Sequence, residues 1–150
     1  MLNSRTSICG GWLFCALALG ACSTQPMTMS DATAMSARLS GASEVPPTAT
    51  SASGSVEASL DKKSSELSWT VTYSGLSGPA TAAHFHGPAM AGANAGVVVP
   101  LTGDMASPMK GKSILTAAQA ADLLAGKWYM NVHTAANPGG EIRGQVTPRN

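Results

Sequence analysis

Cysteine is absent from everything after residue 22, since the three cysteines of the chain are Cys9, Cys15 and Cys22. A disulfide framework, thiolate catalysis and cysteine-ligated zinc are therefore excluded for the rest of the chain. Charged residues make up only 11% of the sequence and aromatic residues 5%, so groups able to do chemistry are scarce. Nine Lys and Arg against eight Asp and Glu form no basic stripe, which argues against nucleic acid as a partner.

A membrane-spanning segment is also missing, because the apolar stretch 12–19 is too short to cross a bilayer. It follows the positive Arg5 and has the length of the apolar centre of a secretory signal. It ends in Leu19-Gly20-Ala21-Cys22, which resembles the lipobox of bacterial lipoproteins. The resemblance implies a signal peptide over 1–21 and lipid on Cys22. An ordinary secreted protein with an incidental cysteine is the alternative.

Lipid on Cys22 would make the membrane a partner of the protein. Two or more acyl chains anchor a protein durably, so we expect a location in the bacterial cell envelope. Ser23 follows the cysteine, where lipoproteins kept in the inner membrane often carry an acidic residue. The outer membrane, facing the periplasm, is therefore the expected site.

Residues 22–36 are rich in Ser, Thr, Ala and Met without periodicity, which indicates a tether. Residues 37–148 are expected to form one domain, long enough to bury its own core. Within it, apolar and polar residues alternate in short segments separated by Gly, Pro and Ser. Strands are expected from 37 to the stop at Pro46-Pro47 and over 55–60, 67–74, 82–86, 97–99, 128–133 and 141–146.

One helix interrupts this pattern. Thr116 is a suitable N-cap, residues 117–124 place apolar side chains on one side, and Gly126 suits the position after the helix. Seven or eight strands with one crossover helix predict an all-β fold. We expect an antiparallel Greek-key sandwich or flattened barrel, of the immunoglobulin or superoxide-dismutase type.

The three histidines of the chain fall in two short patches, His84-Phe85-His86 and the segment that ends at His133. Side chains at i and i+2 of a strand share a face, and the apolar neighbours of these histidines face inward. All three imidazoles are therefore expected on the polar face, where packing does not require them. Such a set could hold Cu(II) or Zn(II), and the affinity order of divalent metals favours copper. Local hydrogen bonding at a strand end is the alternative.

Other polar residues could support such a site. Asn131 shares the face of His133 and could fix the tautomer of an imidazole. Glu141 and Arg143 are expected outward on the neighbouring strand, either as a cross-strand ion pair or as groups that guide anions. Glu44 could reach the end of the sheet as a carboxylate ligand.

Methionine is a second source of metal ligands, because thioethers suit Cu(I). The candidates lie in the expected tether and loops: Met27, Met29, Met35, Met90, Met105 and Met109. A copper relay is one interpretation of them, and filling gaps in a small core is the other. Met130 is expected in the core.

Other catalytic arrangements are not found in the sequence. No serine has a histidine and an aspartate arranged around it, and the Gly-rich segment 75–78 lacks the lysine of a phosphate loop. Paired carboxylates of the kind used in glycoside hydrolysis are absent. No catalytic residue is therefore assigned.

Read together, several segments resemble the CHRD (chordin-type) domain: Leu39–Pro47, Thr81–Gly87, Leu123–Thr134 and Asn137–Gln145. The match runs from about Ala37 to Val146 in the family's order, and Ser43 stands where members more often carry Gln. The resemblance implies a domain that in bacteria is secreted or lipid-anchored, with copper handling as a suggested role. In animal chordins the domain accompanies growth-factor-binding modules.

The His-x-His-Gly segment, His84 to Gly87, is also similar to the copper-ligand strand of Cu/Zn superoxide dismutases. The disulfide cysteines and the long zinc-binding loop that accompany that motif are missing from this chain.

These observations predict an envelope-anchored protein that sequesters or buffers a metal ion, copper or zinc, through the surface histidines His84, His86 and His133. The expected partners are the ion and, through the lipid, the membrane. Two other functions stay open. One is a structural or interaction module of the envelope without metal, and the other is an oxidoreductase of the superoxide-dismutase type.

Overall fold

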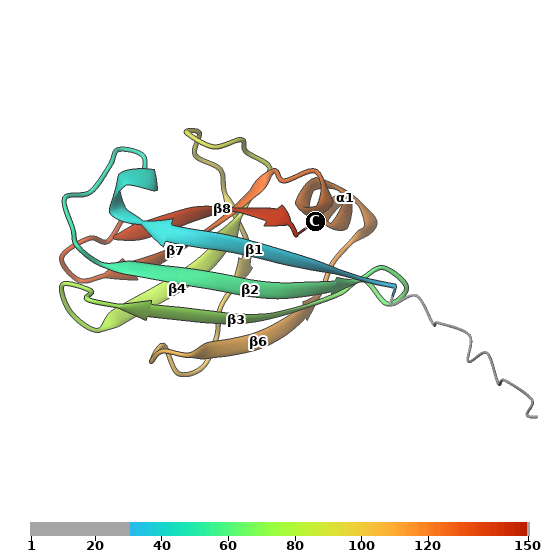
Figure 1. Cartoon of the computed structure of the whole chain (residues 1–150), viewed down its shortest axis with the longest axis horizontal. Helices are drawn as coiled ribbons and strands as arrows, with labels where there is room; N and C mark the ends of the chain where they lie inside the picture. The colour runs from blue at the N-terminus through green and yellow to red at the C-terminus, as the bar shows by residue number, and fades with distance from the viewer. Residues whose placement is uncertain (1–30, 150) are drawn as a thin grey trace, which may run out of the picture.

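The computed structural model describes residues 31–149 of the chain (Figure 1). The expected signal peptide, Cys22 and the first part of the expected tether lie outside the described residues. Within that range, no helix combines the length and the apolar character that crossing a membrane requires.

The described part of the chain forms an eight-stranded antiparallel sheet with one α-helix and one short 3-10 helix. The strands are β1 (Ala32–Ser40), β2 (Ser53–Asp61), β3 (Glu66–Ser74), β4 (Ala80–His86), β5 (Val97–Pro100), β6 (Met109–Ile114), β7 (Trp128–Thr134) and β8 (Ile142–Pro148). The 3-10 helix η1 (Gly41–Ser43) follows β1, and α1 (Ala117–Leu124) lies between β6 and β7. Along the sheet the order is β5-β4-β7-β8-β1-β2-β3-β6.

The sheet curls until its two edge strands approach each other (Figure 1). Val98 and Val99 of β5 line one groove together with Lys110 and Lys112 of β6, although these strands stand at opposite ends of the sheet order. The fold is therefore a nearly closed barrel. This confirms the all-β antiparallel class predicted from the alternating segments.

The core fills the inside of the barrel with the inward residues of each strand. In β3, Leu67, Trp69 and Val71 are buried between polar residues that face outward. Trp69 packs edge to face on Phe85 of β4, with ring centroids 5.3 Å apart. The period of two that predicted these strands is thus the pattern that fills the core.

Helix α1 begins at the predicted residue and ends where predicted. Thr116 is its N-cap and forms a capping box with Gln119, in which each side chain accepts a hydrogen bond from the other's backbone N–H, at 3.2 and 2.8 Å. Gly126 adopts a φ of +68°, the left-handed conformation that glycine favours after a helix. Leu123 is buried and attaches the helix to the core.

Two strands differ from the expectation. The segment Met109–Ile114 was not expected to be a strand, because it alternates weakly, but it pairs with β3 over its whole length. Strand β1 begins at Ala32, inside the segment expected to be a tether, and Ala32 lies opposite Asp61 of β2. It also ends at Ser40, before the expected stop at Pro46-Pro47, because the 3-10 helix η1 follows it directly. Small Ala, Ser and Thr side chains carry little hydrophobic signal, which explains why the sequence pattern did not reveal the start of the strand.

Three of the candidate methionine ligands belong to the core instead. Met35 and Met109 are buried, and Met105 packs against the core, so these thioethers fill gaps. Met130 is buried as predicted. Met90 is 63% exposed, while Met27 and Met29 lie outside the described residues.

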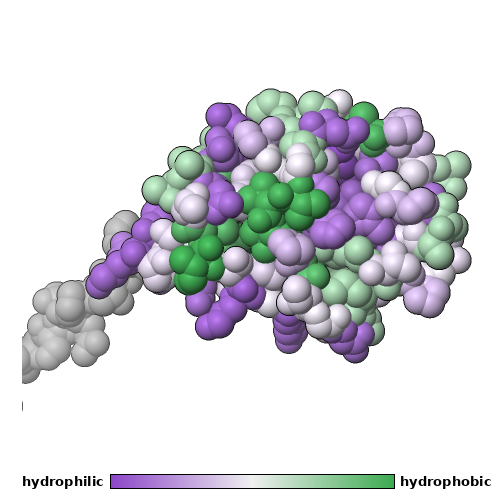
Figure 2. All heavy atoms as spheres, turned by 180° about the vertical axis from the view of Figure 1, so that it is seen from behind, coloured by the Kyte–Doolittle hydropathy of each residue, from purple (hydrophilic) through white to green (hydrophobic). Residues whose placement is uncertain are grey.

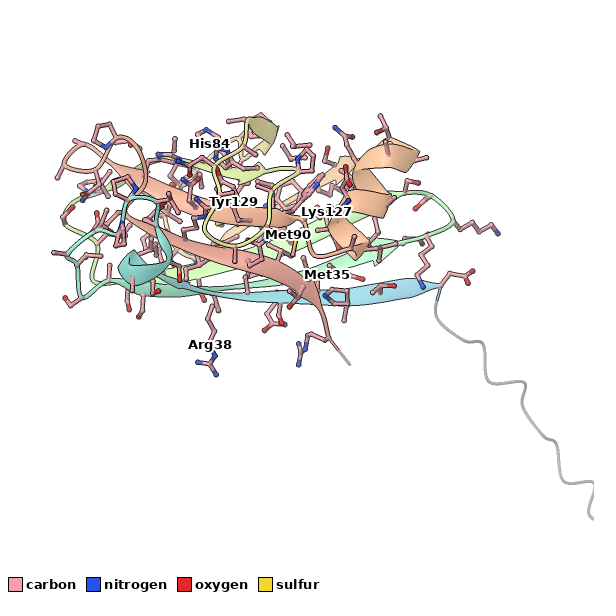
Figure 3. All side chains as sticks on the ribbon, turned by 90° about the horizontal axis from the view of Figure 1, so that it is seen from above. Met35, Arg38, His84, Met90, Lys127 and Tyr129 are labelled. Atoms are coloured by element: carbon pink, nitrogen blue, oxygen red, sulfur yellow. The ribbon has the colours of Figure 1, made fainter. Side chains whose placement is uncertain are left out.

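Strand β7 is buried along its whole length. The core covers one of its faces, and the loop 87–96 between β4 and β5 covers the other. The N–H of Ala89 donates to Lys127 O at 2.8 Å, and the N–H of Ala95 donates to the Tyr129 hydroxyl at 3.2 Å, which hold this loop in place. Figure 3 labels Tyr129 on β7 and Met90 on this loop. The outward side of β4 and β7 is therefore a second, polar interior.

Candidate metal centre

Antiparallel pairing of β4 with β7 brings the histidines together. His84 lies opposite Asn131, and His133 lies opposite Ala82. Because side chains two residues apart share a face, the three imidazoles and the Asn131 amide project to the same side. One ligand nitrogen from each of His84, His86 and His133 lies within 4.8 Å of the other two.

Both ring nitrogens of His133 are engaged. Nδ1 lies 3.0 Å from Pro138 O, and Nε2 lies 3.0 Å from His84 Nδ1 and 2.9 Å from Asn131 Oδ1. Both nitrogens therefore face a carbonyl oxygen, which only accepts hydrogen bonds, whereas a neutral ring carries a single hydrogen. With that hydrogen on Nδ1, the ring donates to Pro138 O and keeps an Nε2 lone pair that can bind a metal.

His86 is held in the same way. Its Nδ1 lies 3.0 Å from Ala95 O, in the loop that covers the sheet, and its Nε2 lies 3.0 Å from Asn131 Oδ1. The ring also stacks flat on Tyr129, with centroids 4.7 Å apart and 2° between the planes. Its orientation is therefore set by neighbours, and a hydrogen on Nδ1, donated to Ala95 O, leaves Nε2 free to bind a metal.

Hydrogen-bond acceptors consequently face one another at the centre of the cluster. Nε2 of His86 and Nε2 of His133 both contact Asn131 Oδ1, which has no hydrogen to donate. A hydrogen on His84 Nδ1 can be donated to His133 Nε2. It leaves the contacts of the two Nε2 atoms with Asn131 Oδ1 without a hydrogen. A metal cation is the kind of group that satisfies lone pairs converging without a hydrogen between them.

The exposure expected for the imidazoles is wrong for two of the three. His86 and His133 are each 8% exposed, whereas His84 is only partly buried. The rings do lie on the face away from the core, but the loop 87–96 and the turn 135–141 cover that face. Alternation along a strand predicts which face a side chain takes. It does not reveal a loop that folds over that face.

Burial lowers the pKa of both His84 and His133. The neighbouring imidazoles lower the pKa of His84 further. For His133, the hydrogen bond to Pro138 raises the pKa, but not enough to reverse the direction. Rings with a lowered pKa stay neutral at more acidic pH, so a metal meets less competition from protons.

Glu141 is not part of the expected surface ion pair. It is fully buried, and its carboxylate accepts hydrogen bonds from the side chains of Thr50, Ser77 and Thr134 and from the Ser77 backbone, at 2.6–2.9 Å. Burial raises the pKa of Glu141, but these hydrogen bonds outweigh burial and lower the pKa to about 2. Glu141 therefore ties β7 to two loops that pass beside it.

Arg143 is 2% exposed and also differs from the expectation, because a role in guiding anions needs an exposed guanidinium. Its Cζ lies 3.3 Å from the centre of the Tyr129 ring, and it donates to Asn94 Oδ1 at 2.8 Å and to Ala93 O. Arg143, Tyr129 and His86 thus form a stack that orients the imidazole. Tyr129 was not an expected site residue, although it lies two residues before Asn131 and so shares the same face of β7.

Glu44 stands beside this cluster and is 5% exposed. Burial raises its pKa, which Arg143, the Val45 backbone N–H and the Asn131 side chain lower in part. Its Oε1 has no hydrogen-bond partner among the described residues. The group of possible metal ligands found in the described range contains the three histidines without Glu44, so a direct ligand role for this carboxylate finds no support.

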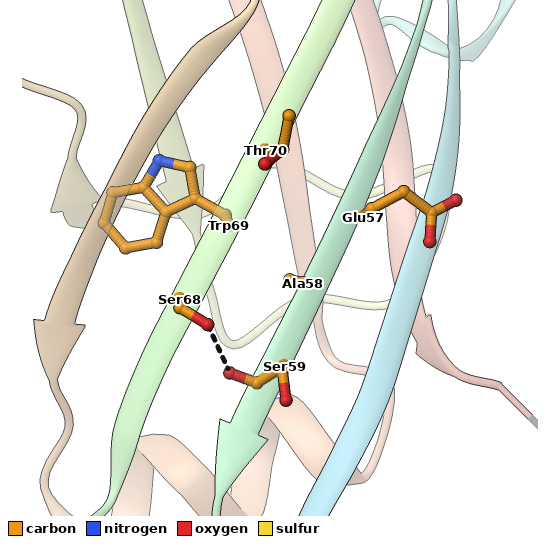
Figure 4. Close-up of a pocket in the computed structure, with 6 residues that line it drawn as sticks. All are labelled: Glu57, Ala58, Ser59, Ser68, Trp69 and Thr70. Carbon is orange, nitrogen blue, oxygen red and sulfur yellow. Dashed lines mark hydrogen bonds between the residues drawn. The ribbon is translucent and has the colours of Figure 1, made fainter.

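Other surface features lie away from the histidines. A shallow hollow on β2 and β3 is lined by Glu57, Ala58, Ser59, Ser68, Trp69 and Thr70 (Figure 4). Apolar side chains also gather on the face seen in Figure 2. Among the described residues, the large apolar side chains counted as exposed are Met90, Val97 and Ile114. None of these features combines several ligand atoms as the histidine cluster does.

Comparison with known protein families shows to which family this barrel belongs. The CHRD domain model matches residues 35–146, a range that runs from β1 to β8 and contains all three histidines and Asn131. The chain is a CHRD-domain protein. The resemblance inferred from the sequence is thereby confirmed. Neither the search of curated proteins nor the search of solved structures gives a match, and the similarity of this CHRD domain to superoxide dismutases rests on the His-x-His-Gly segment alone.

Proposed function

We propose that this CHRD-domain protein sequesters one divalent transition-metal ion, copper or zinc, with His84, His86 and His133 as ligands. The observation that supports the proposal best is the pair of backbone carbonyls, Ala95 O and Pro138 O, opposite the two Nδ1 atoms. They leave two Nε2 lone pairs directed at an oxygen. A neutral ring has only one hydrogen for these two oxygens, and a metal cation on Nε2 would remove the conflict.

The ligand set favours particular metals. Three imidazoles without a thiolate suit Cu(II) or Zn(II), and the affinity order favours copper where both are present. In a tetrahedral site with bonds of about 2.0–2.1 Å, ligand atoms lie about 3.4 Å apart. The nitrogens are already within 4.8 Å of one another, so small rotations of the rings would close them around an ion. Two of the rings are buried, which suits retention of the ion.

Titration of the metal-free chain with Cu(II) and Zn(II) at pH 7, against a competing chelator, tests the proposal. We expect one ion per chain and binding at least tenfold weaker in His86→Ala, because a ligand and its tautomer-fixing contact are both lost. His84→Ala is a second variant at the most exposed ring, and Glu57→Gln, at an exposed carboxylate on β2, is the control. Absence of uptake at micromolar metal, or uptake that neither histidine variant changes, would leave an interaction module as the better interpretation.

An anchor in the cell envelope is the second part of the proposal, supported by the lipobox-like segment that ends at Cys22. When the chain is expressed in a Gram-negative host with a labelled fatty acid, we expect label on the wild type and its recovery with the outer membrane. Cys22→Ser should lose the label, while Cys15→Ser, inside the expected signal peptide, should keep it on the mature protein. Equal labelling of the wild type and Cys22→Ser would contradict the anchor.

A further inference from the structure

Asn131 holds the central position of the histidine cluster. Its Oδ1 is 3.0 Å from Nε2 of His86 and 2.9 Å from Nε2 of His133, and the residue is 2% exposed. An amide oxygen so close to two imidazole lone pairs is well placed to be a ligand itself, because oxygen donors bind the same divalent ions. The sequence-based role for Asn131, fixing a tautomer, does not need its oxygen, because Ala95 O and Pro138 O can accept the hydrogens of the two Nδ1 atoms.

The amide can serve as a ligand only if its oxygen, and not its nitrogen, faces the imidazoles. On the other side of the amide stands Glu44, a buried residue whose Oε1 has no hydrogen-bond partner among the described residues. Both side chains crowd against Gly140: a Cβ built there would collide with Glu44 Oε1 and would lie 2.7 Å from Asn131 Nδ2. The carboxylate and the Nδ2 end of the amide are therefore close neighbours.

This contact decides between the two orientations of the amide. A carboxylate only accepts hydrogen bonds, so it attracts the Nδ2 end and repels the Oδ1 end. The carbonyl of Gly139 lies 3.5 Å from Nδ2 and acts in the same direction. Turning the amide over would place its oxygen against two acceptors, which is unfavourable in a buried site.

We propose that Asn131 Oδ1 is the fourth metal ligand and that Glu44 is the positioning residue that holds this oxygen toward the histidines. The inference rests on the proposed metal binding and deepens it, because it makes the site a closed set of three nitrogens and one oxygen. Closed four-ligand sites retain their metal, whereas catalytic sites keep a position open. A neutral amide oxygen is a hard donor, so the site favours Cu(II) or Zn(II) over Cu(I).

Paired substitutions at Glu44 test this role. Glu44→Leu removes the acceptor, whereas Glu44→Gln keeps an oxygen that can accept from Asn131 Nδ2. We expect Zn(II) affinity to fall by about 10-fold to 100-fold in Glu44→Leu and to recover to within about threefold of the wild type in Glu44→Gln. The electron paramagnetic resonance spectrum of the Cu(II)-loaded chain should change in Glu44→Leu, because the oxygen ligand is lost, and should stay close to the wild type in Glu44→Gln.

Asn131→Ala removes the proposed oxygen directly and decides the question if Glu44→Leu does not fold, as judged by circular dichroism. Its Cu(II) spectrum should differ from the wild type, and Glu57→Gln should leave the spectrum unchanged. A wild-type chain that binds metal while Glu44→Leu and Asn131→Ala keep the same affinity and spectrum would overturn the inference and leave the histidine site standing. A wild-type chain that binds no metal would instead refute the proposed function itself.

Discussion

Replacing Glu141 with glutamine is expected to lower the free energy of unfolding by about 2–3 kcal/mol at pH 7 and to remove the contribution of this carboxylate to the acid sensitivity of the fold. The carboxylate accepts hydrogen bonds from Thr50, Ser77 and Thr134 in a fully buried position. Glutamine offers an N–H₂ group to donors that already point inward, so some of these donors lose their acceptor.

The pH dependence of the unfolding free energy follows from the direction in which folding shifts the pKa of Glu141. The pKa of Glu141 falls from 4.5 to about 2 in the folded chain, so folding favours the ionised carboxylate. Its stabilisation is fully present above pH 4.5 and is lost as the pH falls toward 2. By linkage, this amounts to about 3 kcal/mol.

Urea unfolding of both proteins at pH 7 and pH 2.5 measures this contribution. The difference in unfolding free energy between wild type and Glu141→Gln should be about 2–3 kcal/mol at pH 7 and much smaller at pH 2.5. Glu57→Gln removes an exposed carboxylate that pairs with Arg149, and such pairs contribute about 0–1 kcal/mol. A difference that is the same at both pH values would show that Glu141 acts by packing alone.

Replacing Gly140 with alanine is expected to destabilise the fold by about 2–4 kcal/mol and to weaken metal binding as well. Gly140 has a φ of +129°, which L side chains rarely adopt. The added Cβ would also displace Glu44 and lie 2.7 Å from Asn131 Nδ2. Both the backbone and the amide beside the histidines must therefore shift.

Gly139→Ala is the matched control, because a Cβ at Gly139 meets nothing within 4 Å. Thermal unfolding and Zn(II) competition should separate the two variants, with Gly139→Ala close to the wild type in both. Equal stability of the two variants would contradict the geometry described for Gly140. Equal metal binding with unequal stability would show that Glu44 and Asn131 tolerate the displacement.

The candidate site shows which inferences a sequence can support. Alternation around Phe85 and Val132 placed His84, His86 and His133 on one face, and the structure brings their nitrogens within 4.8 Å. The same reasoning expected Glu141 and Arg143 in solvent, yet both are buried. Alternation reports the side of a sheet on which a residue lies, but loops such as 87–96 carry no signal for the face they will cover.

The elements of the fold also divide into those that local sequence signals predict and those that depend on a pairing partner. The strongly alternating β3 and the capped helix α1 were predicted because local signals determine them. The start of β1 and all of β6 were missed because they are strands mainly through their partners β2 and β3. Small or polar side chains at those positions gain order from backbone pairing, which only the assembled sheet supplies.

The sequence alone determined the all-β class, the short helix, the single face of the histidines and the family resemblance, because each depends on local periodicity or on residue types in order. The tertiary structure alone decided that the histidine face is a covered interior. It also decided that Ala95 O and Pro138 O lie opposite the Nδ1 atoms of two histidines and that Glu44 stands behind Asn131. These contacts join residues far apart in the chain, and their geometry arises only when the sheet closes and its loops fold over it.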